Sequence, residues 1–164
     1  ALAVDVVVMA AGKGTRMKSR LPKVLHRLGG RALLDHVVAA AAGVKPRRLI
    51  VVTGHGSEQV AEAARAFAAA QGLPCDTVLQ EPQLGTGHAV QQALPLLPED
   101  GTCLVLNGDV PLVATDTLQA LVQACGGQAT GPRHPRQTAF HSPSSSARQG
   151  QRSVDHCAMK SGSR

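Results

Sequence analysis

The chain has 164 residues, of which 43% are hydrophobic but only 1% aromatic, and its net charge is +6. This length predicts one domain with a core of Val, Leu, Ile and Ala. Residues 126–164 carry 6 Lys/Arg and 1 Asp, while residues 1–125 carry 11 Lys/Arg and 10 Asp/Glu. Because the excess positive charge lies in the last residues, it argues against a nucleic-acid-binding domain. No apolar run reaches the roughly 18 residues of a membrane span.

Strand-like and helix-like segments alternate in the first 125 residues. Residues 3–10 (AVDVVVMA) predict a strand that is buried on both faces, because its apolar residues run almost without alternation. A strand followed by a helix, four times over, predicts an α/β fold of three layers, α/β/α, with a mostly parallel, Rossmann-like sheet. Ligands of such sheets bind at the carboxyl ends of the strands. The other strands are predicted over residues 48–53, 75–80 and 102–107, and the helices over residues 31–42, 58–71, 86–94 and 115–125.

The strand and helix pattern ends near residue 126. Residues 126–164 are rich in Ser, Arg, Gln, Pro and Gly and have no apolar periodicity, which predicts a low-complexity, disordered tail. Two explanations stay open: a basic tail that interacts with a partner, or a stretch unrelated to the fold, such as a product of out-of-frame translation. We favour the second, and divide the chain into a domain at residues 1–125 and an unrelated tail at residues 126–164.

The cysteines and the first residues bear on the compartment. Cys75, Cys103, Cys125 and Cys157 form no C-x-x-C pair and have no zinc-ligand spacing with a histidine, which predicts reduced thiols in the cytosol. Asp5 lies within the first apolar run and the basic residues follow it, an order that is wrong for a signal peptide. The sequence therefore predicts a cytoplasmic protein.

The loop after the first predicted strand, AAGKGTRM at residues 10–17, combines small residues with cations. It does not match a Walker loop, G-x-x-x-x-G-K-[ST], because Gly14 follows Lys13 where Ser or Thr is required. It does not match a dinucleotide loop, G-x-G-x-x-G, because Met17 holds the third glycine position. The small residues still let the backbone approach a ligand and present N–H groups to anionic oxygens.

The same region is strongly basic. No acidic residue lies between Asp5 and Asp35, and seven Lys and Arg residues in this interval suit a polyanion such as a triphosphate. Pro22 restricts the backbone before Lys23 and can orient that side chain. Three of the seven, which we interpret as solvated surface cations, are Lys18, Arg20 and Arg27.

Two further candidate segments follow the fourth and third predicted strands. Asp109 lies just past an apolar strand, where a carboxylate near a phosphate loop suits Mg²⁺, but it is equally compatible with a turn, and spacing alone does not decide. In QEPQLGTGHAV, residues 80–90, the amides suit the edge of a nucleobase and the helix start favours anions. His88 is interpreted as structural, since the seven histidines show no metal-ligand spacing.

Together, these three segments resemble the sugar nucleotidyltransferases, and within that family the uridylyltransferase domain of the bacterial bifunctional uridylyltransferase/acetyltransferases. The resemblance covers residues 4–125. One departure is Asn107, because that position is usually Tyr in the subfamily. The matching motifs are A-A-G-x-G-T-R-M at residues 10–17, L-P-K at 21–23, Q-L-G-T-G-H-A at 83–89 and G-D-V-P-L at 108–112.

The resemblance implies a fold of the nucleotide-diphospho-sugar transferase type and a set of site residues. Arg16 and Lys23 would be catalytic: Arg16 would meet the departing pyrophosphate, and Lys23 would neutralise charge at the α-phosphate. Gln80 would recognise uracil, and Asp109 would hold Mg²⁺. The residues that would contact the nucleotide are Met9, Ala10, Ala11, Gly12, Gly14, Lys23, Gln80, Gly85, Thr86, Asn107, Gly108 and Asp109.

The reaction implied by the family joins UTP and N-acetylglucosamine 1-phosphate into UDP-N-acetylglucosamine and pyrophosphate, for peptidoglycan and lipopolysaccharide synthesis. The family's sugar-holding segment, its G-Y-G-R-like motif and the asparagine that completes the magnesium site have no counterpart in residues 126–164, so the domain is expected to be incomplete. The alternative is therefore a truncated, inactive nucleotide-binding fragment. No hexapeptide repeat of an acetyltransferase domain is visible, and a homo-oligomer is expected only if that domain were present.

Overall fold

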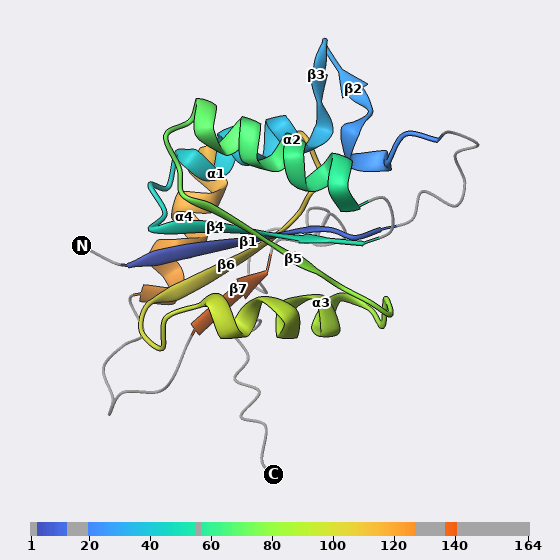
Figure 1. Cartoon of the computed structure of the whole chain (residues 1–164). Helices are drawn as coiled ribbons and strands as arrows, with labels where there is room; N and C mark the ends of the chain where they lie inside the picture. The colour runs from blue at the N-terminus through green and yellow to red at the C-terminus, as the bar shows by residue number, and fades with distance from the viewer. Residues whose placement is uncertain (1–2, 13–19, 55–56, 127–136, 141–164) are drawn as a thin grey trace.

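The computed structural model describes residues 3–12, 20–54, 57–126 and 137–140. These residues build three layers, with a central sheet between two layers of helices (Figure 1). The predicted α/β/α architecture is confirmed. In chain order the elements are β1 (Val4–Ala10), η1 (Lys23–Leu25), β2 (Arg27–Leu28), β3 (Arg31–Ala32), α1 (Leu33–Ala42), β4 (Arg48–Thr53), α2 (Ser57–Ala70), β5 (Cys75–Leu79), α3 (Thr86–Ala93), η2 (Leu94–Leu96), β6 (Thr102–Asn107), α4 (Thr115–Gly126) and β7 (Gln137–Phe140).

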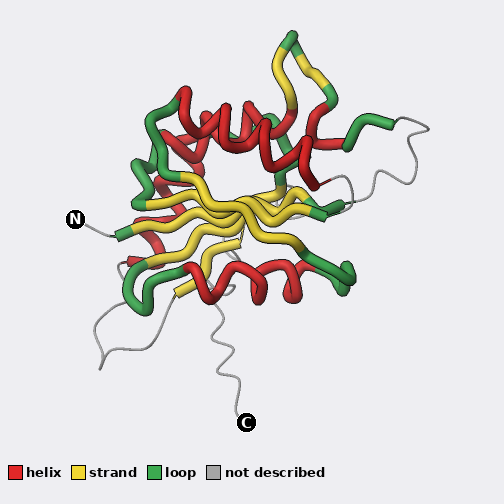
Figure 2. Tube along the Cα trace, in the orientation of Figure 1, coloured by secondary structure: helices red, strands yellow, loops and turns green. Residues whose placement is uncertain are grey.

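Five parallel strands form the central sheet in the order β5-β4-β1-β6-β7. From β1 the chain proceeds through β4 to β5 on one side, and it then crosses to β6 and β7 on the other side. The order of the strands therefore reverses between β1 and β6. In doubly wound sheets, the ligand crevice lies at this switch point, outside the carboxyl ends of the strands. Figure 2 shows the sheet as a twisted band between the helices.

β1 is buried on both faces, as its sequence predicts. Val6 and Val8 face a core that contains residues of α1, α2 and α4, whereas Val7 faces a second core that contains residues of α3. All three side chains are fully buried, because successive residues of a strand point to opposite faces of the sheet. Three helices thus cover one face and α3 covers the other (Figure 1). None of the described helices is long and apolar enough to cross a lipid bilayer.

Short elements between the first strand and the first helix are not predicted by periodicity. β2 and β3 form a hairpin, and Gly29 and Gly30 connect them with φ of 59° and 83°. Two successive positive φ angles are what a two-residue hairpin turn of type I′ requires, and glycine adopts them without strain. The Gly-Gly pair is a hairpin signal, but strands of two residues have no alternation to detect.

The last strand corrects the prediction for the C-terminal segment. β7 pairs in parallel with β6, from Thr102 opposite Gln137 to Val105 opposite Phe140. The prediction of a tail unrelated to the fold is therefore wrong for these four residues. A short edge strand joins a sheet through backbone hydrogen bonds, which require no apolar periodicity. The rest of the predicted tail, residues 127–136 and 141–164, lies outside the described residues.

Candidate functional site

A cavity of about 370 Å³ lies at the carboxyl ends of β1 and β6, at the switch point of the sheet. Residues from segments that are far apart in the sequence form its wall, because parallel strands end at the same edge. The segments are the ends of β1 and β6 with their following loops, η1, and the loop from β5 into α3. The lining residues are Met9, Ala11, Gly12, Lys23, Val24, Gln80, Gln83, Gly85, Thr86, Ala89, Asn107 and Asp109.

The ends of β1 and β6 are held close together below the cavity. Met9 and Asn107 are register partners, and the backbone N–H of Gly108 donates to the carbonyl oxygen of Met9 at 2.9 Å. A Cβ atom at Gly108 would stand 3.1 Å from that oxygen and 3.4 Å from side-chain atoms of Leu34 and Val24. Gly108 therefore serves the close approach of β6 to β1 and lies behind the lining residues.

Lys23 and Asp109 form an ion pair across the cavity lining. The Nζ atom of Lys23 lies 2.9 Å from Oδ2 of Asp109, and the two side chains are 45% and 37% exposed. Pro22 precedes η1 with a φ of −53°, and the buried side chain of Val24 anchors the turn that carries Lys23. Because both charges are partly solvated, the pair is weak and open to exchange with other ions.

The donor set of the cavity bears on metal binding. Asp109 is the one carboxylate among the described lining residues. No group of three or more His, Cys, Asp or Glu that could hold a metal occurs within the described part of the chain. Mg²⁺ is commonly held by one or two carboxylates, with substrate phosphates and water as the other ligands. The oxygen donor therefore fits an ion shared with a nucleotide, and the lining does not form a protein-only metal cage.

Gln80 also lines the cavity. Its backbone N–H donates to the carbonyl oxygen of Thr53 at 2.7 Å, and the residue is only 4% exposed. The side-chain Nε2 donates to the carbonyl oxygen of Gly85 at 3.0 Å and lies 3.1 Å from Nδ1 of His88. Gly85 precedes α3 with a φ of 101°, a conformation that favours glycine. The Gln80 amide is thus held by the first turn of the helix.

The predicted site residues fall into three groups. Ala10 and Gly108 do not line the cavity. The side chain of Ala10 is buried in the core that contains α1. Gly14 and Arg16 lie outside the described residues. The predicted residues that the cavity brings together are Met9, Ala11, Gly12, Lys23, Gln80, Gly85, Thr86, Asn107 and Asp109.

Three lining residues, Val24, Gln83 and Ala89, are not among the predicted site residues. Gln83 packs against Gly54: a Cβ atom there would collide with Nε2 of Gln83 and stand 2.7 Å from the carbonyl oxygen of Ala11. Gly54 therefore lets the end of β4 fit between two walls of the cavity. A glycine directly after a buried strand is the signal that could have revealed this close packing.

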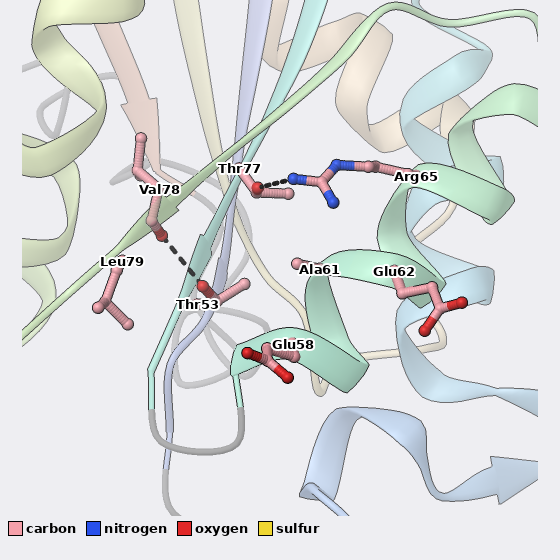
Figure 3. A pocket seen from close by; sticks show the side chains of 8 residues that line it. All are labelled: Thr53, Glu58, Ala61, Glu62, Arg65, Thr77, Val78 and Leu79. Carbon is pink, nitrogen blue, oxygen red and sulfur yellow. Dashed lines mark hydrogen bonds between the residues drawn. The ribbon is translucent and has the colours of Figure 1, made fainter.

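A larger hollow of about 600 Å³ lies elsewhere, beside β4, β5 and α2. Figure 3 shows Arg65 reaching from α2 to Thr77, with Glu58 and Glu62 on the same helix. The Nη2 atom of Arg65 donates to Oγ1 of Thr77 at 2.8 Å, so this cation is already engaged within the protein. None of the predicted site residues lines this hollow, and the smaller cavity is the better candidate site.

Known proteins share sequence with most of this chain. The profile of the MobA-like NTP transferase domain family matches residues 6–159. The bifunctional protein GlmU of Polaromonas naphthalenivorans (strain CJ2) is 65% identical over 125 residues, which cover 76% of this chain and 26% of the relative. GlmU of Methylibium petroleiphilum is 65% identical over 124 residues, 75% of this chain and 26% of the relative. The resemblance predicted from the motifs is confirmed, and the chain spans about a quarter of the length of these curated relatives.

Solved structures share the fold. Rv0371c from Mycobacterium tuberculosis H37Rv superposes with a TM-score of 0.60 at 26% identity, covering 82% of this chain and 70% of that chain. A manganese complex of the same mycobacterial protein gives a TM-score of 0.57 at 24% identity, covering 82% and 69%. A UDP-glucose pyrophosphorylase complexed with UDP-glucose gives 0.58 at 20% identity, covering 74% and 54%.

Proposed function

The chain belongs to the family of MobA-like NTP transferase domains, and from this premise we propose that it is the nucleotide-binding part of a sugar-1-phosphate uridylyltransferase. The proposed reaction uses UTP and N-acetylglucosamine 1-phosphate. A phosphate oxygen of the sugar attacks the α-phosphorus of UTP, and the bond from that phosphorus to the oxygen bridging to the β-phosphate breaks. Pyrophosphate leaves, and the product is UDP-N-acetylglucosamine. Because these nucleotides are cytoplasmic metabolites, we propose the cytoplasm as the site of the reaction.

One observation carries the proposal. A single cavity brings together a cation, a carboxylate and a buried amide from three separate segments: Lys23, Asp109 and Gln80. One relative, 65% identical over 125 residues, is a bifunctional protein named GlmU, and the uridylyltransferase motifs at residues 83–89 and 108–112 support a uridylyl donor. Nucleotidyl transfer needs positioning and charge neutralisation more than covalent catalysis, so this set of groups is sufficient in kind.

Each residue has a proposed role. Lys23 neutralises the charge that gathers at the α-phosphate, and it leaves its partner Asp109 to do so. Asp109 would hold Mg²⁺ through its carboxylate, and the ion would supply positive charge to neutralise the phosphates. Gly12 leaves room for the nucleotide, because no atom of the described residues lies within 4 Å of the position of a Cβ there. Arg16, outside the described residues, is proposed to meet the departing pyrophosphate.

A second candidate function is nucleotide binding without turnover. The family's sugar-holding motifs have no counterpart in residues 126–164. The match to GlmU of Polaromonas naphthalenivorans also covers only 76% of this chain. A chain of this kind would hold Mg²⁺ and UTP but would position the sugar phosphate poorly.

Two measurements on this chain test both functions. Isothermal titration with UTP and Mg²⁺, with CTP, ATP and GTP in parallel, measures nucleotide binding and preference. Release of pyrophosphate on addition of N-acetylglucosamine 1-phosphate measures transfer. Binding that prefers UTP, with fast sugar-dependent release, supports the transferase and rejects the inactive fragment. Preferential UTP binding without release supports the fragment, and the absence of nucleotide binding contradicts both.

A further inference from the structure

The side-chain amide of Gln80 has an orientation that its surroundings determine. The nitrogen Nε2 lies 3.0 Å from the carbonyl oxygen of Gly85, a group that can only accept a hydrogen bond. An amide oxygen in that place would face another oxygen, so the nitrogen must occupy it. The same carbonyl accepts the first backbone hydrogen bond of α3, from Ala89 N–H at 3.1 Å, which holds it in position. The usual ambiguity between the two ends of an amide is therefore removed.

The second hydrogen of this amide is directed at His88. Nδ1 of His88 lies 3.1 Å from Nε2 of Gln80, and since Nε2 donates, Nδ1 must accept. A neutral imidazole with an accepting Nδ1 carries its proton on Nε2. Nε2 of Gln92 lies 3.1 Å from that second ring nitrogen, and because two N–H donors would face each other there, this tautomer requires the Gln92 amide to be turned over so that its oxygen accepts. One chain of hydrogen bonds thus runs from the carbonyl of Gly85 to Gln92.

The cavity consequently meets only one end of the Gln80 amide. Both N–H groups are used by Gly85 and His88, and Oε1 makes no hydrogen bond with any residue in the described part of the chain. Gln80 is 4% exposed and lines the cavity, so its oxygen is the polar atom it can offer to a ligand. A ligand there must donate a hydrogen, because two facing acceptors repel and remain unpaired.

We propose that His88 is a positioning residue that, together with the carbonyl of Gly85, makes Gln80 an acceptor and so selects the base of the nucleotide. This inference rests on the proposed function and deepens it. Uracil presents an N–H at ring position 3, which the Gln80 oxygen can accept. Cytosine presents a bare nitrogen at the same position, so it would place an acceptor against an acceptor. A site built to receive a hydrogen rejects the analogue that lacks it, because the buried group is left unpaired.

The test measures the ratio of the dissociation constants for CTP and UTP, each with Mg²⁺, by isothermal titration. His88→Leu removes one of the two acceptors that hold Nε2 of Gln80 and leaves only the carbonyl oxygen of Gly85 to oppose rotation of the amide, so we expect the ratio to fall at least about tenfold. His88→Asn supplies an oxygen near the position of Nδ1, and it should restore the ratio to within about threefold of the wild type. Gln92→Leu is the matched control, which removes the contact on the other ring nitrogen and should change the ratio less than about threefold.

If His88 had only a structural role, His88→Leu would weaken the binding of both nucleotides equally and leave the ratio unchanged. That result would overturn this inference, whereas a preference of the wild-type chain for UTP would still support the proposed function. A wild-type chain without preference for UTP over CTP would overturn both. If the melting temperature shows that His88→Leu fails to fold, the nucleotide preference of His88→Asn and the tautomer of His88 in the wild-type chain still test the inference. Long-range ¹H–¹⁵N correlation spectra of the wild-type chain should find the His88 proton on Nε2, and a proton on Nδ1 would reject the inference without any ligand.

Discussion

At the residue scale, Lys23 and Asp109 form the ion pair that we propose the nucleotide and its metal ion replace. We expect Lys23→Ala to weaken binding of UTP with Mg²⁺ at least about tenfold, because a charge-assisted contact contributes about 1.5–3 kcal/mol and Asp109 would then repel the phosphates. Isothermal titration measures the change. The matched control is Arg27→Ala, which removes the same charge from the exposed hairpin strand β2. Unchanged binding in Lys23→Ala, or an equal loss in the control, would contradict the role of Lys23.

Gly108 and Gly12 serve different purposes although they lie on the same edge of the sheet. A Cβ atom at Gly108 would press on the carbonyl oxygen of Met9 at 3.1 Å, whereas at Gly12 it would meet no atom of the described part of the chain within 4 Å. Gly108→Ala should therefore lower the free energy of unfolding by about 1–3 kcal/mol, the usual cost of overpacking. Gly12→Ala should leave stability unchanged and reduce UTP affinity. Urea unfolding measures the stability of both variants, and titration with UTP measures their affinity. Equal free energies of unfolding for the two variants would show that β6 shifts to accommodate the added methyl group.

Cys75, at the start of the edge strand, should be an unreactive thiol. The pKa of Cys75 is raised from 9.0 to about 11, chiefly by burial and in addition by Asp76, while Arg65 acts in the opposite direction. Because the thiolate is the reactive form, alkylation of Cys75 at pH 8 should be about a hundredfold slower than for an ordinary thiol. Mass spectrometry of the Cys75 peptide after timed treatment with iodoacetamide measures the rate. The urea-unfolded chain is the control, and equal rates in the two states would refute the shift.

At the scale of elements, an ion pair of the buried Asp5 joins the amino-terminal ends of the strands. Asp5 of β1 is buried, and the Nη2 atom of Arg47 lies 2.7 Å from its Oδ2. The same Nη2 donates to the carbonyl oxygen of Asp100 at 2.8 Å, and the hydrogen bond that Arg47 donates to Asp5 raises the pKa of Arg47 above its ordinary value. Arg47 thus joins the segments that precede β4 and β6 to the central strand. The Asp5 carboxylate depends on this cation, because its Oδ1 has no partner among the described residues.

Arg47→Ala should therefore destabilise the chain strongly. Removing one partner of a buried ion pair leaves an uncompensated charge and costs about 3 kcal/mol. The free energy of unfolding in urea, measured at neutral pH, gives the loss. Asp100→Ala is the control: that carboxylate is 76% exposed, and its removal should cost less than about 1 kcal/mol. Similar losses in the two variants would mean that the buried carboxylate is hydrated or shifts to another partner.

At the scale of the whole molecule, the order of the strands sets the order of local stability. β1 has paired neighbours on both sides and is buried on both faces, while β5 is an edge strand with partly exposed side chains. Amides exchange through local opening, so peptides of β1 should take up deuterium most slowly and those of β5 much faster. Hydrogen exchange with mass spectrometry resolves the two. Equal protection of β5 and β1 would indicate that another chain covers the edge in solution.

Most of the fold and much of the site could be predicted from local patterns. The apolar run of β1 and the helical spacing after each strand depend on neighbours along the chain, so they appear directly in the residues. Parallel strands end at one edge, and for that reason the segments around Lys23, Gln80 and Asp109 could be assigned to one site. β7 could not be predicted, because a four-residue edge strand pairs through its backbone alone.

By itself, the sequence determined the alternation of strands and helices, the family and the chemistry of the loops. The tertiary structure alone decided that Lys23 pairs with Asp109, that Gly108 packs on Met9, and that His88 orients the amide of Gln80. These contacts depend on the order of strands, on register and on the orientation of side chains. Local periodicity reports which face of an element is buried, but it carries no information on which distant residue lies opposite.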